Sequence, residues 1–137
     1  MVTRRQACLA WFLAAASGPV RAQVAILESV AGSVQDGVWR LRFRTGPAAR
    51  VRVARATLLL HIAAGAAPDF IDIVKPLKGR AETRLQRDGW ITAQIPARCA
   101  QRLLDQEGFL EFKAAPSLAF HLPSQTGFAP YLVVEGK

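Results

Sequence analysis

Arginines alternate with large apolar residues in the segment Trp39–Thr45, which reads WRLRFRT. Because successive side chains of a β-strand point to opposite faces, Arg40, Arg42 and Arg44 are expected in a row, about 7 Å apart. A guanidinium group can bind a carboxylate or phosphate through two parallel hydrogen bonds. The pattern therefore predicts a surface that binds an acidic polymer, and the open alternative is a solvated face that prevents edge-to-edge strand pairing.

Five further residues are candidates for binding the same ligand. Two of them continue the basic pattern after the Gly46-Pro47 turn, and the other three have rings expected to point outward, since they alternate with the apolar residues of their strands. Exposed rings and cations are what acidic sugars need. The five are Arg50, Arg52, His61, His121 and Tyr131.

No local motif for catalysis or metal binding is present in the sequence. The two histidines, His61 and His121, lack the spacing of a ligand pair. Cys99 has no accompanying catalytic pattern and is expected to be a packed, inert thiol. The serines lack a nucleophile-elbow sequence, and the acidic residues are scattered. We therefore expect a protein that is not an enzyme and that holds no metal or cofactor.

The first 22 residues have the pattern of a cleavable signal peptide. Arg4 and Arg5 precede an apolar run, Ala7–Gly18, and cleavage is expected after Ala22. A run of about a dozen residues is too short to cross a bilayer. The sequence thus predicts a signal peptide at 1–22 and one domain at 23–137, secreted or periplasmic, with no membrane span after cleavage. The Arg4-Arg5 pair leaves the twin-arginine export route open.

Residues 23–137 keep 15 of the 18 basic residues and all 10 acidic ones, a net charge of +5. Positive charge favours anionic partners such as acidic polysaccharide, lipopolysaccharide or lipid headgroups. Export disfavours nucleic acid as the partner. Cys99 is the single cysteine of this part, so it can form no internal disulfide.

The apolar pattern has a period of two almost throughout, which is typical of strands with one buried face. A change of parity near Ala54-Arg55 predicts a bulge, and Pro96 is expected to start a short helix at Ala97–Gln106. The stretch Lys78–Asp88 is expected to be an exposed loop or a fraying helical turn, and residues 109–113 and 118–122 a hairpin. The other expected strands are Val24–Val30, Trp39–Thr45, Arg50–Ile62, Asp69–Val74, Trp90–Ile95 and residues 130–136. Such an order predicts an all-β sandwich with one short helix.

Six short pieces in this order resemble the DNRLRE domain, also called the disaggregatase-related repeat. They span about Gly37 to Glu135 and are Leu41-Arg42-Phe43, Ala56–Leu60, Trp90–Leu103, Gly108–Phe112, Leu118-Ala119-Phe120 and Pro130–Val134. The resemblance implies a jelly-roll β-sandwich of secreted and surface proteins, some of which bind carbohydrate. The chain departs from the family at Gln94, where Asp is common, and before Trp90, where it is shorter.

Two functions follow as expectations. The first is an exported, non-catalytic module that binds anionic polysaccharide through the arginine-rich sheet face. The second is a structural or protein-interaction subunit of an envelope or extracellular assembly, bound to another envelope protein through outward apolar residues such as Leu59 and Val133. A weaker similarity to the propeptides of transforming growth factor beta proteins, also sandwiches, is consistent with the second.

Overall fold

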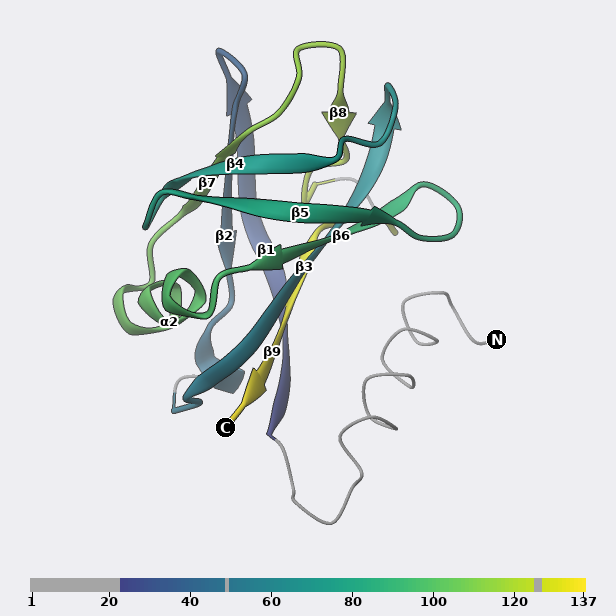
Figure 1. The fold of residues 1–137 in the computed structure, drawn as a ribbon. Helices are drawn as coiled ribbons and strands as arrows, with labels where there is room; N and C mark the ends of the chain where they lie inside the picture. Colours follow the sequence, from purple (N-terminus) through teal and green to yellow (C-terminus); the bar gives the residue numbers. More distant parts are fainter. Residues whose placement is uncertain (1–22, 49, 125–126) are drawn as a thin grey trace.

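A computed structural model describes residues 23–48, 50–124 and 127–137, and these form nine strands and one α-helix (Figure 1). The predicted all-β class is confirmed, and the expected signal peptide lies outside the described residues. The strands are β1 (Val24–Gln35), β2 (Val38–Phe43), β3 (Val53–Ala64), β4 (Phe70–Lys75), β5 (Gly79–Leu85), β6 (Trp90–Ile95), β7 (Leu110–Lys113), β8 (Ala119–Phe120) and β9 (Tyr131–Gly136). The helices are a short 3-10 turn, η1 (Gly46–Ala48), and α2 (Ala97–Gln106).

Eight of the strands close into a barrel. Their order is β6-β5-β4-β7-β2-β1-β9-β3, the additional β3–β6 pairing completes the circle, and every pair is antiparallel. Strand β8 is appended to the end of β3. Closure leaves few unpaired strand edges. The finer expectation of a jelly-roll sandwich is not confirmed, because the hydrogen-bonded pairs run continuously around the barrel.

Inward-pointing side chains fill the barrel. The predicted alternation of β2 is confirmed, since Trp39, Leu41 and Phe43 are buried while the arginines between them are exposed. The Trp39 ring stacks on Phe112 and meets Phe120 edge-on, with centroid distances of 6.4 and 5.3 Å. Burying such rings supplies much of the apolar area that stabilises a small β domain.

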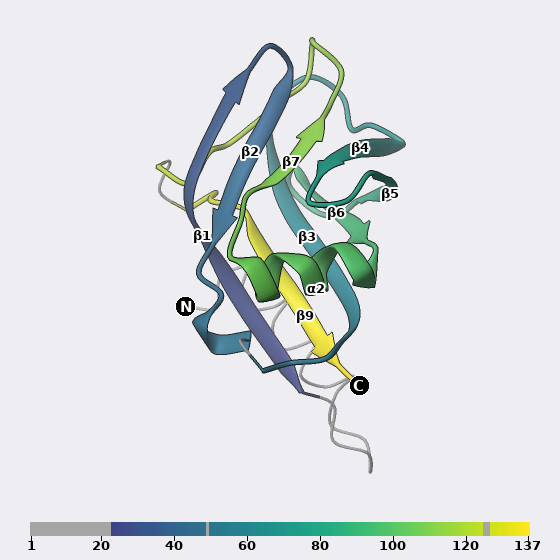
Figure 2. The same ribbon diagram turned by 90° about the vertical axis from the view of Figure 1, so that its left-hand side faces the viewer.

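Helix α2 lies across one end of the barrel, beside the start of β3 (Figure 2). Its bounds match the predicted helix, and Pro96 precedes its first residue as expected. Cys99, Ala100, Leu103 and Leu104 form the face that is buried against the core. The opposite face carries Arg98 and Arg102, which are exposed.

The helix α2 is neither long nor apolar enough to cross a membrane, and it is the only α-helix in the described part of the chain.

Strand β1 is longer than predicted because it continues through Ala31-Gly32-Ser33 to Gln35. A register shift between Ser29 and Ala31 allows this. The hairpin to β2 turns at Asp36 and Gly37, with φ of 53° and 76°. Two consecutive residues of positive φ match the twist of the flanking strands, so this turn fixes the pairing of β1 with β2.

The predicted irregularity in β3 is confirmed, because the register with β9 shifts between Val53 and Arg55. The prediction of an exposed loop or a helical turn at Lys78–Asp88 is wrong, since Gly79–Leu85 forms strand β5 between β4 and β6. In β5 only Ala81 is fully buried. Because the segment is polar, it lacks the apolar alternation that predicts a strand. Backbone hydrogen bonds to β4 and β6 stabilise it instead.

The expected hairpin between residues 109–113 and 118–122 is also wrong. Strand β7 pairs with β2 and β4, whereas β8 pairs with β3. The two segments are neighbours in sequence, but closing the barrel requires them to join different partners. The Ala115–Leu118 turn, in which Leu118 N–H donates to Ala115 O, redirects the chain.

Candidate functional site

The arginine row of β2 lies on the outside of the barrel, as predicted. Arg40, Arg42 and Arg44 are all exposed. Arg42 lies opposite Ala31 of β1, and Arg40 lies opposite Glu111 of β7. The three side chains therefore share one surface, but their electrostatic surroundings differ.

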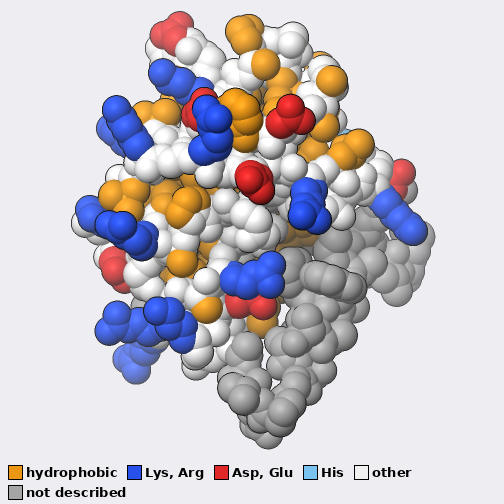
Figure 3. Space-filling view, viewed as in Figure 1, with side chains coloured by type: hydrophobic (Ala, Val, Ile, Leu, Met, Phe, Trp, Pro, Cys, Tyr) orange, Lys and Arg blue, Asp and Glu red, His pale blue; other side chains and the backbone are white. Residues whose placement is uncertain are grey.

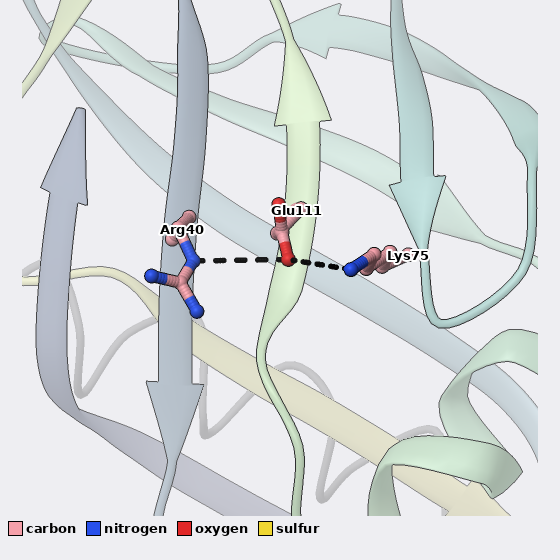
Figure 4. Close-up of polar contacts among 3 residues, drawn as sticks. All are labelled: Arg40, Lys75 and Glu111. Atoms are coloured by element: carbon pink, nitrogen blue, oxygen red, sulfur yellow. Dashed lines mark ion pairs between the residues drawn. The ribbon is translucent and has the colours of Figure 1, made fainter. Parts of the chain in front are cut away.

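Arg40 is held by a carboxylate on the neighbouring strand. Its Nε lies 3.7 Å from Glu111 Oε2, and Lys75 Nζ approaches the same oxygen at 3.9 Å (Figure 4). Its guanidinium also lies over the Phe109 ring, 4.2 Å from the centroid. One negative charge is thus shared between two cations, and the positive potential around Arg40 is reduced.

The same arrangement recurs two strands away. Arg80 Nε donates to Asp72 Oδ1 at 3.4 Å, and its guanidinium lies 3.7 Å from the centroid of Phe70. We call the outer surface of β2, β7, β4 and β5 that carries these contacts the paired face; its charged residues in contact are Arg40, Lys75, Arg80, Asp72 and Glu111.

Arg42 and Arg44 form no ion pair with any described residue. The backbone N–H of Arg44 donates to Glu28 O at 2.8 Å, which anchors the end of β2 beside β1. Arg44 thus has a fixed backbone and an exposed side chain. Such a cation is available to an anionic ligand.

Arg50 and Arg52 lie between η1 and β3, at the barrel end where α2 is found. Both are exposed. The peptide flanking Arg52 is fixed, because Gln101 of α2 accepts from Val53 N–H and donates to Val51 O. Nine residues of extended chain, about 30 Å, separate Arg52 from His61. The predicted basic and histidine candidates therefore lie at opposite ends of the barrel.

His61 and His121 are brought together, which the sequence did not predict. Their Nδ1 atoms are 2.9 Å apart, and His61 Nε2 is 2.8 Å from the carbonyl oxygen of Asp88. Since a carbonyl only accepts, His61 Nε2 must carry a hydrogen. Neutral His61 then accepts at Nδ1 from His121.

Aromatic rings surround the two imidazoles. Phe128 lies over both, with centroid distances of 4.2 Å to His61 and 4.9 Å to His121, and Trp90 meets His61 edge-on at 5.1 Å. Gly89, with φ of 85°, passes so close that an added Cβ would lie 3.1 Å from His61 Nε2. The pair is half-buried and packed. This arrangement fastens β8 and the turn before β6 to the end of β3.

The prediction that Tyr131 offers an exposed ring is wrong, because its side chain is 1% exposed. Tyr131 points away from the barrel interior, as expected from its alternation with Leu132, but it packs with Leu59, Trp90 and Val133 in a cluster separate from the core. Its ring meets Trp90 at 5.8 Å. Tyr131 therefore packs against its neighbours in this structure.

Cys99 is buried on the inner face of α2, as predicted. Burial raises the pKa of its thiol, which a backbone hydrogen bond with Leu77 lowers by a smaller amount. The thiol is thus neutral near pH 7 and a poor nucleophile. Among the described residues, no group of three or more His, Cys, Asp or Glu side chains could hold a metal ion.

Neither known protein-family models nor curated protein sequences contain a match to this chain. The case for a function therefore rests on the surface itself. The sequence reasoning missed Arg98 and Arg102, although four-residue spacing opposite the Cys99 and Leu103 face of the predicted helix would have identified them as exposed. It also missed Phe70 and Phe109, whose role as supports for arginines depends on tertiary contacts.

Proposed function

We propose that residues 23–137 form an exported, non-catalytic module that binds anionic polysaccharide through exposed arginines. One observation carries the proposal: Arg42 and Arg44 point outward from a rigid strand and form no ion pair with the described residues, in a domain of net charge +5. Arginine suits carboxylate-bearing sugars because its planar group forks onto both oxygens.

The resemblance to the DNRLRE domain supports this function, since that family includes carbohydrate-binding modules with a jelly-roll fold. The signal-peptide pattern at residues 1–22 supports it as well, because acidic polysaccharides are found outside the cytoplasm. Both remain arguments from the sequence. They agree with a basic all-β domain whose interior is filled by side chains and whose charge is on the outside.

The alternative is a protein-interaction subunit that uses Leu59 and Val133. Both point away from the barrel interior, but each is 1% exposed and packed with Trp90 and Tyr131. We place polysaccharide binding first because of the exposed arginines of the β2 segment, Arg42 and Arg44, which form no ion pair with the described residues.

Electrophoresis of the full chain in gels containing alginate, pectate or neutral dextran tests the proposal. We expect retardation by the two acidic polymers and none by dextran. Replacing Arg40, Arg42 and Arg44 together by alanine should weaken the retardation. Unchanged mobility of the wild-type protein in all three gels would overturn the proposed function.

A further inference from the structure

Several segments of the chain contribute cations at the α2 end of the barrel. Four stretches of chain meet there, and each contributes at least one exposed cation. We call this surface the basic end; its cations are Arg44, Arg50, Arg52, Lys78, Arg98 and Arg102. Figure 3 shows lysine and arginine side chains gathered at the lower left, where Figure 1 places α2 and the adjoining end of the barrel.

Gln101 joins α2 to the segment that carries Arg50 and Arg52. Its amide accepts from Val53 N–H at 2.9 Å and donates to Val51 O at 3.3 Å, and so replaces a neighbouring strand at this point. Arg102 follows Gln101 directly, and Arg98 precedes it by nearly one helical turn. The backbone segments that carry Arg98 and Arg102 and Arg50 and Arg52 are therefore held side by side.

Two further contacts bring in Arg44 and Lys78. Thr45, which follows Arg44, donates its hydroxyl to Glu107 Oε1 at the end of α2, at 3.2 Å. On the other side, the Cys99 thiol has a hydrogen bond with the backbone of Leu77, the residue before Lys78. The three other segments of the basic end are thus each tied to α2 by a contact in the described chain.

The charge of the basic end is not neutralised in the way that it is on the paired face. None of its six cations has an ion pair with a described residue. Two carboxylates, Asp105 and Glu107, lie at the end of α2, and each accepts a hydrogen bond from an uncharged side chain. Cations that form no ion pair with the described residues produce a positive potential that attracts anions.

We infer that the basic end is an anion-binding site in which Arg98 and Arg102 act together with Arg44, Arg50 and Arg52 on a carboxylate-bearing polysaccharide. This inference rests on the proposed function and moves its main contact from the sheet face to the α2 end. Cations spread over four segments can meet successive carboxylates of one chain. The row of arginines on β2 alone would contact fewer carboxylates of such a polysaccharide chain.

The absence of exposed apolar anchors favours a soluble polymer over a lipid surface. Proteins that bind membranes by charge usually add apolar side chains that enter the bilayer. The large apolar residues exposed in the described chain are Val30, Val34, Phe70, Leu85 and Phe128, and none belongs to the four segments of the basic end.

Charge reversal on α2 tests the inference in the full chain. Arg98→Glu/Arg102→Glu changes the net charge by the same amount as the control Arg84→Glu/Arg87→Glu. Arg84 and Arg87 are exposed, and Arg84 lies five residues, about 17 Å, beyond Gly79, the part of β5 nearest to α2. We expect affinity for alginate oligomers to fall about tenfold in the α2 variant and less than about threefold in the control, as a local contact requires.

Any other outcome contradicts either the α2 site or the proposed function. Equal losses in both variants would show that net charge alone governs binding, and unchanged binding in the α2 variant would remove α2 from the site; either result leaves the proposed function intact. Failure of the wild-type protein to bind alginate or pectate overturns the proposed function itself. Binding to vesicles of phosphatidylglycerol and phosphatidylcholine, without binding to alginate, would replace the polysaccharide by a lipid surface.

Circular dichroism and thermal unfolding of each variant show whether the fold is kept. If the reversed charges prevent folding, Arg98→Gln/Arg102→Gln takes their place, with Arg84→Gln/Arg87→Gln as its control. The glutamines keep polar, helix-compatible side chains and remove only the charge. The same contrast between the two pairs is then expected, with smaller losses.

Discussion

The paired face and the basic end contain similar side chains in different electrostatic conditions. On the paired face, Arg40 and Arg80 each contact a carboxylate and lie over a phenylalanine ring. At the basic end, six cations have no ion pair among the described residues. A carboxylate beside an arginine lowers the positive potential that the arginine offers to a ligand, so the number of arginines on a surface does not measure its capacity for anions.

Gln101→Leu should lower the free energy of unfolding by the largest amount, because it removes the contact that joins α2 to the Arg52 segment. It leaves Val53 N–H and Val51 O without their side-chain partner at a buried position, which costs about 1–3 kcal/mol of folding free energy. Urea unfolding followed by circular dichroism measures the change.

Gln86→Leu is the matched control, since its amide donates to Thr92 Oγ1 at an exposed position. Surface substitutions of this kind change stability by less than about 0.5 kcal/mol. Equal destabilisation by the two variants would show that Gln101 has no special role in holding the basic end together.

Arg44→Ala and Arg40→Ala compare the two regions within one strand. We expect the Arg44 variant to bind alginate oligomers about fivefold more weakly, which corresponds to roughly 1 kcal/mol. The Arg40 variant should change affinity less than about twofold, because the neighbouring Glu111 carboxylate lowers the positive potential at that cation. Titration calorimetry at low salt measures both, and a larger loss for Arg40→Ala would reverse the ranking of the two surfaces.

Glu111→Gln should make the paired face resemble the basic end. It removes the carboxylate that contacts Arg40 and Lys75, and so leaves two cations free to contact a ligand. We expect affinity for acidic oligomers to rise about twofold, with a stability change below about 1 kcal/mol, as is usual for partly exposed ion pairs. A fall in affinity would show that pairing helps Arg40 to bind.

The smallest effect is expected for the ionisation of Cys99 and its influence on the free energy of unfolding. The Cys8→Ser variant is used for this measurement, so that Cys99 is the one thiol present. Burial raises the pKa of Cys99, so the native thiol remains neutral as the pH rises through the range in which an unfolded chain ionises, and stability falls there. A thiol reagent at pH 8 should react only after unfolding. The same protection in Arg98→Glu/Arg102→Glu would show that α2 stays docked, whereas rapid labelling of the native protein would contradict the packing of α2.

Local patterns predicted the elements that alternation or capping defines. WRLRFRT indicates a strand with arginines outside, and Pro96 followed by an amphipathic run predicts α2 to the residue. The change of parity near Arg55 predicted the β3 bulge correctly. These features follow from the two-residue period of strands and from the missing N–H of proline, which act within a few residues.

Pairing partners could not be predicted in this way. Strand β5 is polar and has one fully buried side chain, so only its neighbours β4 and β6 identify it as a strand. Likewise β7 and β8 look like a hairpin until barrel closure assigns them to different partners. Backbone hydrogen bonds between strands do not depend on residue type, so the sequence does not indicate which strands pair.

The sequence by itself determined that Arg40, Arg42 and Arg44 point the same way, that Cys99 is packed, and that the domain carries excess positive charge. Tertiary structure alone decided that Glu111 lies beside Arg40, that His61 meets His121, and that α2 with Arg98 and Arg102 lies beside the segment before β3. The division has a physical reason. Side-chain direction is set by the local backbone, whereas the charge that a side chain can offer depends on neighbours brought in from distant parts of the chain.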